Sequence, residues 1–144
     1  MNTNIFKSIA SIMIGAGVSV FLSIGTDGLM RALGVFPLMP PMKDSLFVLA
    51  TVYRTLFGAI GGYLTARIAP TKPMMHAFVL GATGLVASIA GAIASWNKLP
   101  ELGPKWYPIV LIVLAVPPAL AGGWLRVLQL SGQRETSPDE FSTD

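Results

Sequence analysis

Long apolar stretches alternate with short polar connections along the whole chain. Four of these stretches predict helices, at about residues 5–25 or longer, 46–69, 74–96 and 106–128. Each is close to the ~20 residues that cross the hydrocarbon core of a bilayer. The connections are short and contain prolines, which favours antiparallel neighbours. The pattern therefore predicts an all-α fold, an integral membrane four-helix bundle with up-down-up-down topology.

The same pattern predicts one domain and a tail. Residues 1–130 are expected to form a single four-helix transmembrane domain. Residues 131–144 are polar and acidic, and we expect them to form a mobile cytoplasmic tail. The adjacent prolines Pro117 and Pro118 lie in the middle of the fourth stretch and predict a bend there.

Composition narrows the classes of function. Charged residues make up 12% of the chain, about half the share in a soluble domain. There is no cysteine and one histidine, so we expect no metal site and no cofactor. The ten Lys and Arg residues are scattered singly, without the basic patch that nucleic-acid binding needs. The sequence contains no catalytic motif of the common hydrolase, nucleotide or dinucleotide types, so we expect no catalytic residues and no enzyme activity.

The distribution of positive charge predicts an orientation. In the four-span topology the side that holds both termini carries Lys7, Arg67, Lys72, Arg126 and Arg134. The opposite side carries Arg31, Lys43, Lys98 and Lys105. The side with more Lys and Arg faces the cytoplasm, so both termini are expected to be cytoplasmic.

Small residues recur at helical spacing in each apolar stretch. Lipid tails are as apolar as leucine, so membrane helices associate where small residues let their backbones approach closely. The positions expected to take part in helix packing are Gly15, Ser19, Gly58, Gly62, Gly81, Gly84, Ser88 and Gly91. The spacing fits packing within one chain, and it equally fits an outward stripe that meets a second copy or a larger membrane protein.

Arg54 lies well inside the second apolar stretch. It follows Ser45 by nine residues, roughly 13 Å along a helix. An arginine at such depth costs at least ~2.5 kcal/mol unless it is paired or reaches water. In an antiparallel hairpin Asp27 lies toward the same membrane face, so we expect a bidentate intramembrane ion pair that fixes the register of the first two helices. The alternatives are that Arg54 handles anions, lipid headgroups or protons, or that it snorkels to the headgroups unpaired.

Four further residues are expected to contact headgroups or a pathway through the protein, namely Tyr53, Arg31, His76 and Arg67. Arg31 lies one helical turn beyond Asp27 and could share its carboxylate. His76 lies near the beginning of the third stretch, where we expect it to meet headgroups or to cap a turn, with a proton relay as the alternative. Tyr53 is of a type that often forms interhelical hydrogen bonds.

Four segments carry a resemblance to known proteins: "TDGLMRALGVFP", "YRTLFGAIGGYLTARIAP", "HAFVLGATGLV" and "GPKWYPIVLIVLAVPPALAGG". In this order they resemble an uncharacterised family of small bacterial four-span membrane proteins. The resemblance covers nearly the whole chain apart from the first few residues and the tail. It implies a bacterial inner (cytoplasmic) membrane setting, and it implies no activity.

The sequence thus favours a non-enzymatic integral membrane protein, a structural or accessory component surrounded by the lipid bilayer. It would pack with itself as a homo-oligomer or with a larger membrane protein. One alternative is a small oligomeric transporter or channel for protons or anions, in which Arg54, Asp27 and Tyr53 would line the pathway. Another is a lipid- or quinone-binding membrane protein, which predicts an apolar groove with Arg54 or His76 at its mouth.

Overall fold

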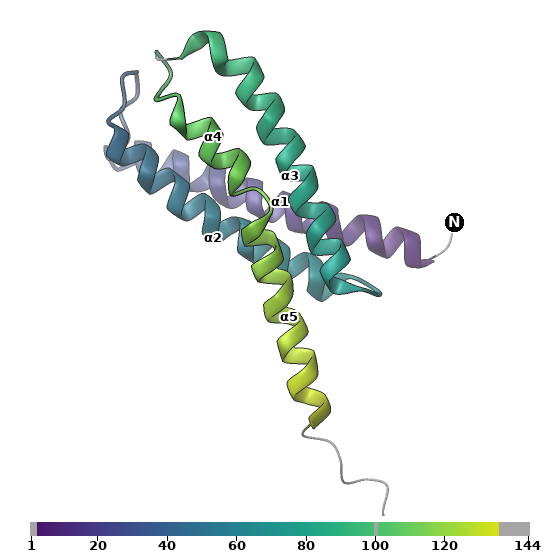
Figure 1. Cartoon of the computed structure of the whole chain (residues 1–144). Coiled ribbons are helices and arrows are strands. Elements are labelled where there is room, and N and C mark those ends of the chain that lie inside the picture. Colours follow the sequence, from purple (N-terminus) through teal and green to yellow (C-terminus); the bar gives the residue numbers. More distant parts are fainter. Residues whose placement is uncertain (1–2, 100, 136–144) are drawn as a thin grey trace, which may run out of the picture.

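The computed structural model describes residues 3–99 and 101–135, and these residues form helices and connections without any strand (Figure 1). The predicted all-α fold is confirmed for this part of the chain. Four segments within it are long and apolar enough to cross a membrane: Thr3–Ala32, Asp44–Ile68, Pro73–Lys98 and Trp106–Gln133.

The helices begin and end close to the predicted positions. Their bounds are α1 Thr3–Ala32, α2 Asp44–Ile68, α3 Pro73–Ser95, the short 3-10 helix η1 Trp96–Lys98, α4 Trp106–Val113 and α5 Pro117–Glu135. The second and third agree with the prediction to within two residues at each end. Hydrophobic length determines these helices, and polar or proline-containing connections end them.

The first helix takes the longer of its two predicted forms and continues to Ala32. It ends where Gly34 adopts a positive φ of 71°, a conformation that suits glycine. The Gly34 amide donates to the Arg31 carbonyl at 3.1 Å, and the Val35 amide donates to the Met30 carbonyl at 2.9 Å. These two bonds satisfy carbonyls that the helix end would otherwise leave free.

The fourth predicted helix is broken rather than bent. Residues 114–116 separate α4 from α5, directly before Pro117 and Pro118. Proline has no amide hydrogen to donate, and its ring clashes with the preceding turn, so the continuous helix cannot pass this point. The second piece also extends further than predicted, because residues 131–135 belong to α5 and not to a polar tail. Residues 136–144, the rest of the predicted tail, lie outside the described residues.

α2 is the central helix, in contact with α1, α3, α4 and α5. Its neighbouring glycines face different partners. A Cβ placed on Gly61 would lie 2.7 Å from the Gly15 carbonyl oxygen of α1. A Cβ placed on Gly62 would lie 2.7 Å from the Cα of Ala119 in α5. In Figure 1, α1 and α2 run together across the view, and α5 crosses α2 on its way down the picture.

Candidate functional site

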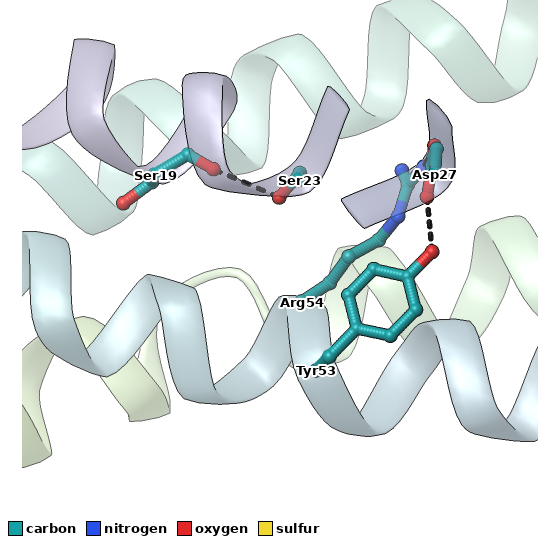
Figure 2. A network of polar contacts seen from close by, with 5 residues as sticks. All are labelled: Ser19, Ser23, Asp27, Tyr53 and Arg54. Atoms are coloured by element: carbon teal, nitrogen blue, oxygen red, sulfur yellow. Dashed lines mark hydrogen bonds and ion pairs between the residues drawn. The ribbon is translucent and has the colours of Figure 1, made fainter. Parts of the chain in front are cut away.

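A cluster of polar side chains joins α1 to α2. Arg54 Nη2 donates to Asp27 Oδ2 at 2.5 Å, and the Tyr53 hydroxyl donates to Asp27 Oδ1. Figure 2 shows Tyr53 and Arg54 reaching from α2 to the single carboxylate on α1. The Arg54 and Asp27 side chains are 34% and 19% exposed, so both are largely shielded by the protein. The predicted ion pair is therefore present.

The geometry of the pair differs from the prediction in one respect. We expected a bidentate contact, but Tyr53 takes the second carboxylate oxygen and leaves Arg54 with one. A tyrosine directly before the arginine reaches the same carboxylate because both point toward α1. Arg54 Nε is buried and has no hydrogen-bond partner among the described residues. Arg31, which we expected could share the carboxylate, is exposed and forms no ion pair with Asp27 there.

The cluster is one of several polar contacts along the interface between α1 and α2. The Ser19 hydroxyl donates to the Phe57 carbonyl at 2.9 Å, and the Thr65 hydroxyl donates to the Ser11 carbonyl at 3.2 Å. Ser11 and Thr65 are fully buried. Backbone carbonyls can accept these bonds because Gly15 and Gly61 allow the two helices to touch.

The residues predicted to take part in helix packing differ in what they contact. Gly15 and Ser19 contact α2, as described above, and Gly62 contacts α5. A Cβ on Gly58 would lie 3.5 Å from Pro118, and one on Gly81 would lie 3.1 Å from Val116.

The remaining three predicted packing residues all lie further along α3. A Cβ on Gly84 would only just reach the break between α4 and α5, 4.0 Å from the Ala115 oxygen. Ser88 and Gly91 line a cavity. Gly91 makes no packing contact within the described chain, because a Cβ there would meet nothing within 4 Å beyond its own stretch of helix, and contact with a partner helix stays a prediction.

The two other predicted polar residues lie far from the cluster along the chain and within the fold. His76 is in the first turn of α3, where its Nδ1 lies 3.2 Å from the Lys72 carbonyl oxygen. The Lys72 carbonyl already accepts from the Met75 and His76 amides, so this contact caps no free group of the helix, and the contact of His76 with headgroups stays a prediction. Arg67 is exposed in the last turn of α2. The structure thus brings Asp27, Tyr53 and Arg54 together and leaves these two outside.

Sequence reasoning did not assign a packing role to Gly122. A Cβ on this residue would lie 2.6 Å from the Tyr63 amide nitrogen, so Gly122 permits the crossing of α5 over α2. The Tyr63 hydroxyl also donates across this crossing to Gln129 Oε1 at 2.9 Å. The adjacent glycines at 122 and 123 could have predicted this role. Two neighbouring small residues face different directions on a helix and can each allow close contact with a different neighbouring helix.

Arg54 also borders two cavities. The larger has a volume of about 580 Å³ and lies among α1, α2, α3 and α4. The smaller, of about 300 Å³, lies beside the connection that follows α1 and is lined by Asp27, Arg31 and Arg54 among others. Arg54 therefore points toward the first helix and borders open space as well.

Within the described residues, no three His, Cys, Asp or Glu side chains gather where they could hold a metal ion. The chemistry of the cluster is that of hydrogen bonding and ion pairing around one carboxylate. Comparison of the chain with protein-family models, with curated proteins and with solved structures found no match.

Proposed function

We propose that this chain is a non-enzymatic integral membrane protein that crosses the bacterial inner membrane four times and acts as a structural or accessory component. The observation that carries the proposal is that most of the apolar residues in the candidate spans are not buried by the rest of the protein. In the most apolar part of each candidate span, at most 28% of the residues are buried, and in α1 only 11%. Apolar surface on this scale needs lipid or partner helices to cover it.

The arrangement of the connections supports the up-down-up-down topology. The connection after α1 and the connection before α4 lie side by side. Met42 of the first connection and Leu102 of the second line the same cavity. The turn between α2 and α3 lies at the opposite end of these helices from the two connections (Figure 1). The excess of Lys and Arg on the side of this turn and of both termini favours a cytoplasmic position for that side.

The polar cluster gives this component a fixed shape. By joining α1 to α2 at Asp27, it holds the outward faces of the two helices in one register. A protein that acts by packing against a second copy or a larger membrane protein needs such a constant surface. Its mechanism is helix docking, which requires no reacting group.

Labelling of single cysteines tests the topology, since the natural chain contains no cysteine. The four variants place a cysteine at exposed sites in the connections and in α5: Lys43→Cys, Thr71→Cys, Lys98→Cys and Ser131→Cys. In intact cells, a membrane-impermeant maleimide should label the variants at 43 and 98. The variants at 71 and 131 should react only after lysis.

A cysteine in place of Val86 is the control for membrane insertion. Val86 is 67% exposed in the middle of α3, so water would reach it in a soluble protein. In a membrane protein lipid covers this position, and we expect no labelling before or after lysis. Rapid labelling of the Val86→Cys variant, or equal labelling in intact cells of the variants at 43, 71, 98 and 131, would contradict the proposed function.

A further inference from the structure

The larger cavity next to Arg54 is lined by small and hydroxyl-bearing side chains. Ser19 and Ser23 of α1 lie on one side of it, and Ser88 and Gly91 of α3 lie on the other. Its remaining lining is mostly apolar, and its volume of about 580 Å³ is in the usual range for a ligand site. The short side chains keep α1 and α3 from filling the space between them.

The smaller cavity adjoins it at the end where α1 finishes and α2 begins. The two cavities share Phe47, Arg54, Leu102 and Tyr107 as lining residues. Together they have an apolar part between helices and a charged end beside the connection that follows α1. This is the shape expected for an amphiphile, whose polar end lies near the membrane surface while its chain lies deeper.

The charges at the polar end favour an anion. Asp27, Arg31 and Arg54 are the charged side chains that line the two cavities, so two cations face one carboxylate. Asp27 is already occupied by Tyr53 and Arg54. The Arg54 side chain is 34% exposed and borders both cavities, and the exposed Arg31 is not ion-paired in the described chain. Guanidinium groups bind phosphate oxygens through strong charge-assisted hydrogen bonds.

We propose that the two cavities bind one anionic phospholipid of the surrounding bilayer. Its phosphate lies between Arg31 and Arg54, and one acyl chain lies between α1 and α3 along Ser19, Ser23 and Gly91. This proposal rests on the membrane placement proposed above. An apolar span of a second copy would fill only the apolar part of the site, whereas an anionic lipid fills that part and also supplies a phosphate to the two arginines, so the charge favours a lipid.

The test uses the full chain in nanodiscs with equal amounts of phosphatidylglycerol, which is anionic, and phosphatidylcholine, which is zwitterionic. Native mass spectrometry then counts the lipids that stay on the protein. The natural chain should keep one phosphatidylglycerol. Failure of the chain to enter nanodiscs would overturn the proposed function as well. A chain that enters them and keeps no lipid overturns the lipid site alone.

One pair of variants tests the acyl-chain site. Gly91→Leu places a side chain in the larger cavity, where a Cβ meets nothing within 4 Å, and should lower lipid retention about tenfold. Gly17→Leu is the matched control, because Gly17 is equally open but lines neither cavity. Equal retention in both variants, or equal loss in both, would contradict the assignment.

A second pair tests the headgroup site without disturbing the polar cluster. Arg31→Gln should lower the preference for phosphatidylglycerol over phosphatidylcholine about threefold, because Arg31 is an exposed charge. Arg67→Gln, also exposed but outside both cavities, should leave the preference unchanged. An unchanged preference in the Arg31 variant would overturn the assignment of the phosphate.

Two further results would replace the lipid by another occupant. A dimer of the natural chain that Gly91→Leu abolishes, without bound lipid, would identify a second copy in the groove. A rise in melting temperature of the delipidated protein with millimolar inorganic phosphate, equal to that with phosphatidylglycerol, would identify a simple anion site. The lipid proposal predicts that Gly91→Leu leaves the oligomeric state unchanged in the first experiment and that the melting temperature rises with phosphatidylglycerol alone in the second.

Discussion

Small residues line both the interface of α1 with α2 and the space between α1 and α3, yet the two regions are built differently. Against α2, a Cβ on Gly61 would come within 2.7 Å of the Gly15 oxygen, and Ser19 donates to the Phe57 carbonyl at 2.9 Å. Against α3, Ser23 and Ser88 line a cavity instead. The same residue types close one interface and hold the other open.

The difference shows that a stripe of small residues permits a contact without creating it. At the first interface, polar groups on each helix reach partners on the other, and Asp27 fixes the register of the pair. At the second, the Ser23 hydroxyl donates to the Ser19 carbonyl and the Ser95 hydroxyl donates to the Gly91 carbonyl, each within its own helix. Without bonds between the helices, dispersion forces alone would have to close the gap.

The largest expected effect comes from adding one methyl group to the closed interface. Gly61→Ala should destabilise the protein by about 3 kcal/mol, because the new Cβ would meet the backbone of Gly15, which cannot move aside alone. SDS-induced unfolding of the purified protein measures the loss.

The matched change at the open interface is Gly91→Ala. Its Cβ meets nothing within 4 Å, so stability should stay the same or rise by up to about 1 kcal/mol through better helix propensity. Similar losses from the two glycine variants would remove the distinction between the interfaces.

A smaller effect is expected at the polar cluster from Tyr53→Phe, which removes one hydroxyl and keeps the ring. The Asp27 carboxylate would lose one of its two partners and keep Arg54. We expect a loss of about 1 kcal/mol in the same unfolding measurement. Tyr63→Phe serves as a comparison, since that hydroxyl bonds to the exposed Gln129. A larger loss for Tyr63 than for Tyr53 would argue against the importance of the cluster.

The smallest effect distinguishes the serines of the two interfaces. Ser19→Ala removes the bond to the Phe57 carbonyl of α2 and should cost about 0.6 kcal/mol, a typical value for hydrogen bonds between membrane helices. Ser88→Ala at the cavity should have no measurable effect on stability. The prediction fails if Ser88→Ala is the more costly of the two.

The sequence predicted the helices well because hydrophobic length and proline are local signals. It also predicted the ion pair of Arg54 with Asp27. A charge deep in an apolar stretch needs a partner, and an antiparallel hairpin of the first two helices places Asp27 at the same level. The break before Pro117 was expected only as a bend, because the sequence does not show whether tertiary contacts restore the missing bonds.

The spaces between helices could not be predicted from the sequence. Gly62 and Gly91 have the same spacing signal, but one touches α5 and the other lines a cavity. Which stripe is in contact depends on the crossing of whole helices, and that is decided by distant residues such as Gly122. The sequence also did not predict that Tyr53 and Arg54 both bind the Asp27 carboxylate. That arrangement depends on the directions of two neighbouring side chains.

The most direct test of the central claim, that the polar cluster holds α1 to α2, is a double-mutant cycle with Asp27→Ala and Arg54→Ala in lipid bicelles. Each single variant should lose about 2 kcal/mol, since removal of one partner leaves the other charge unpaired in a partly shielded site. The double variant should lose no more than either single one, because no unpaired charge remains. Additive losses, or an Arg54→Ala variant as stable as the natural chain, would show that the pair does not hold the hairpin together.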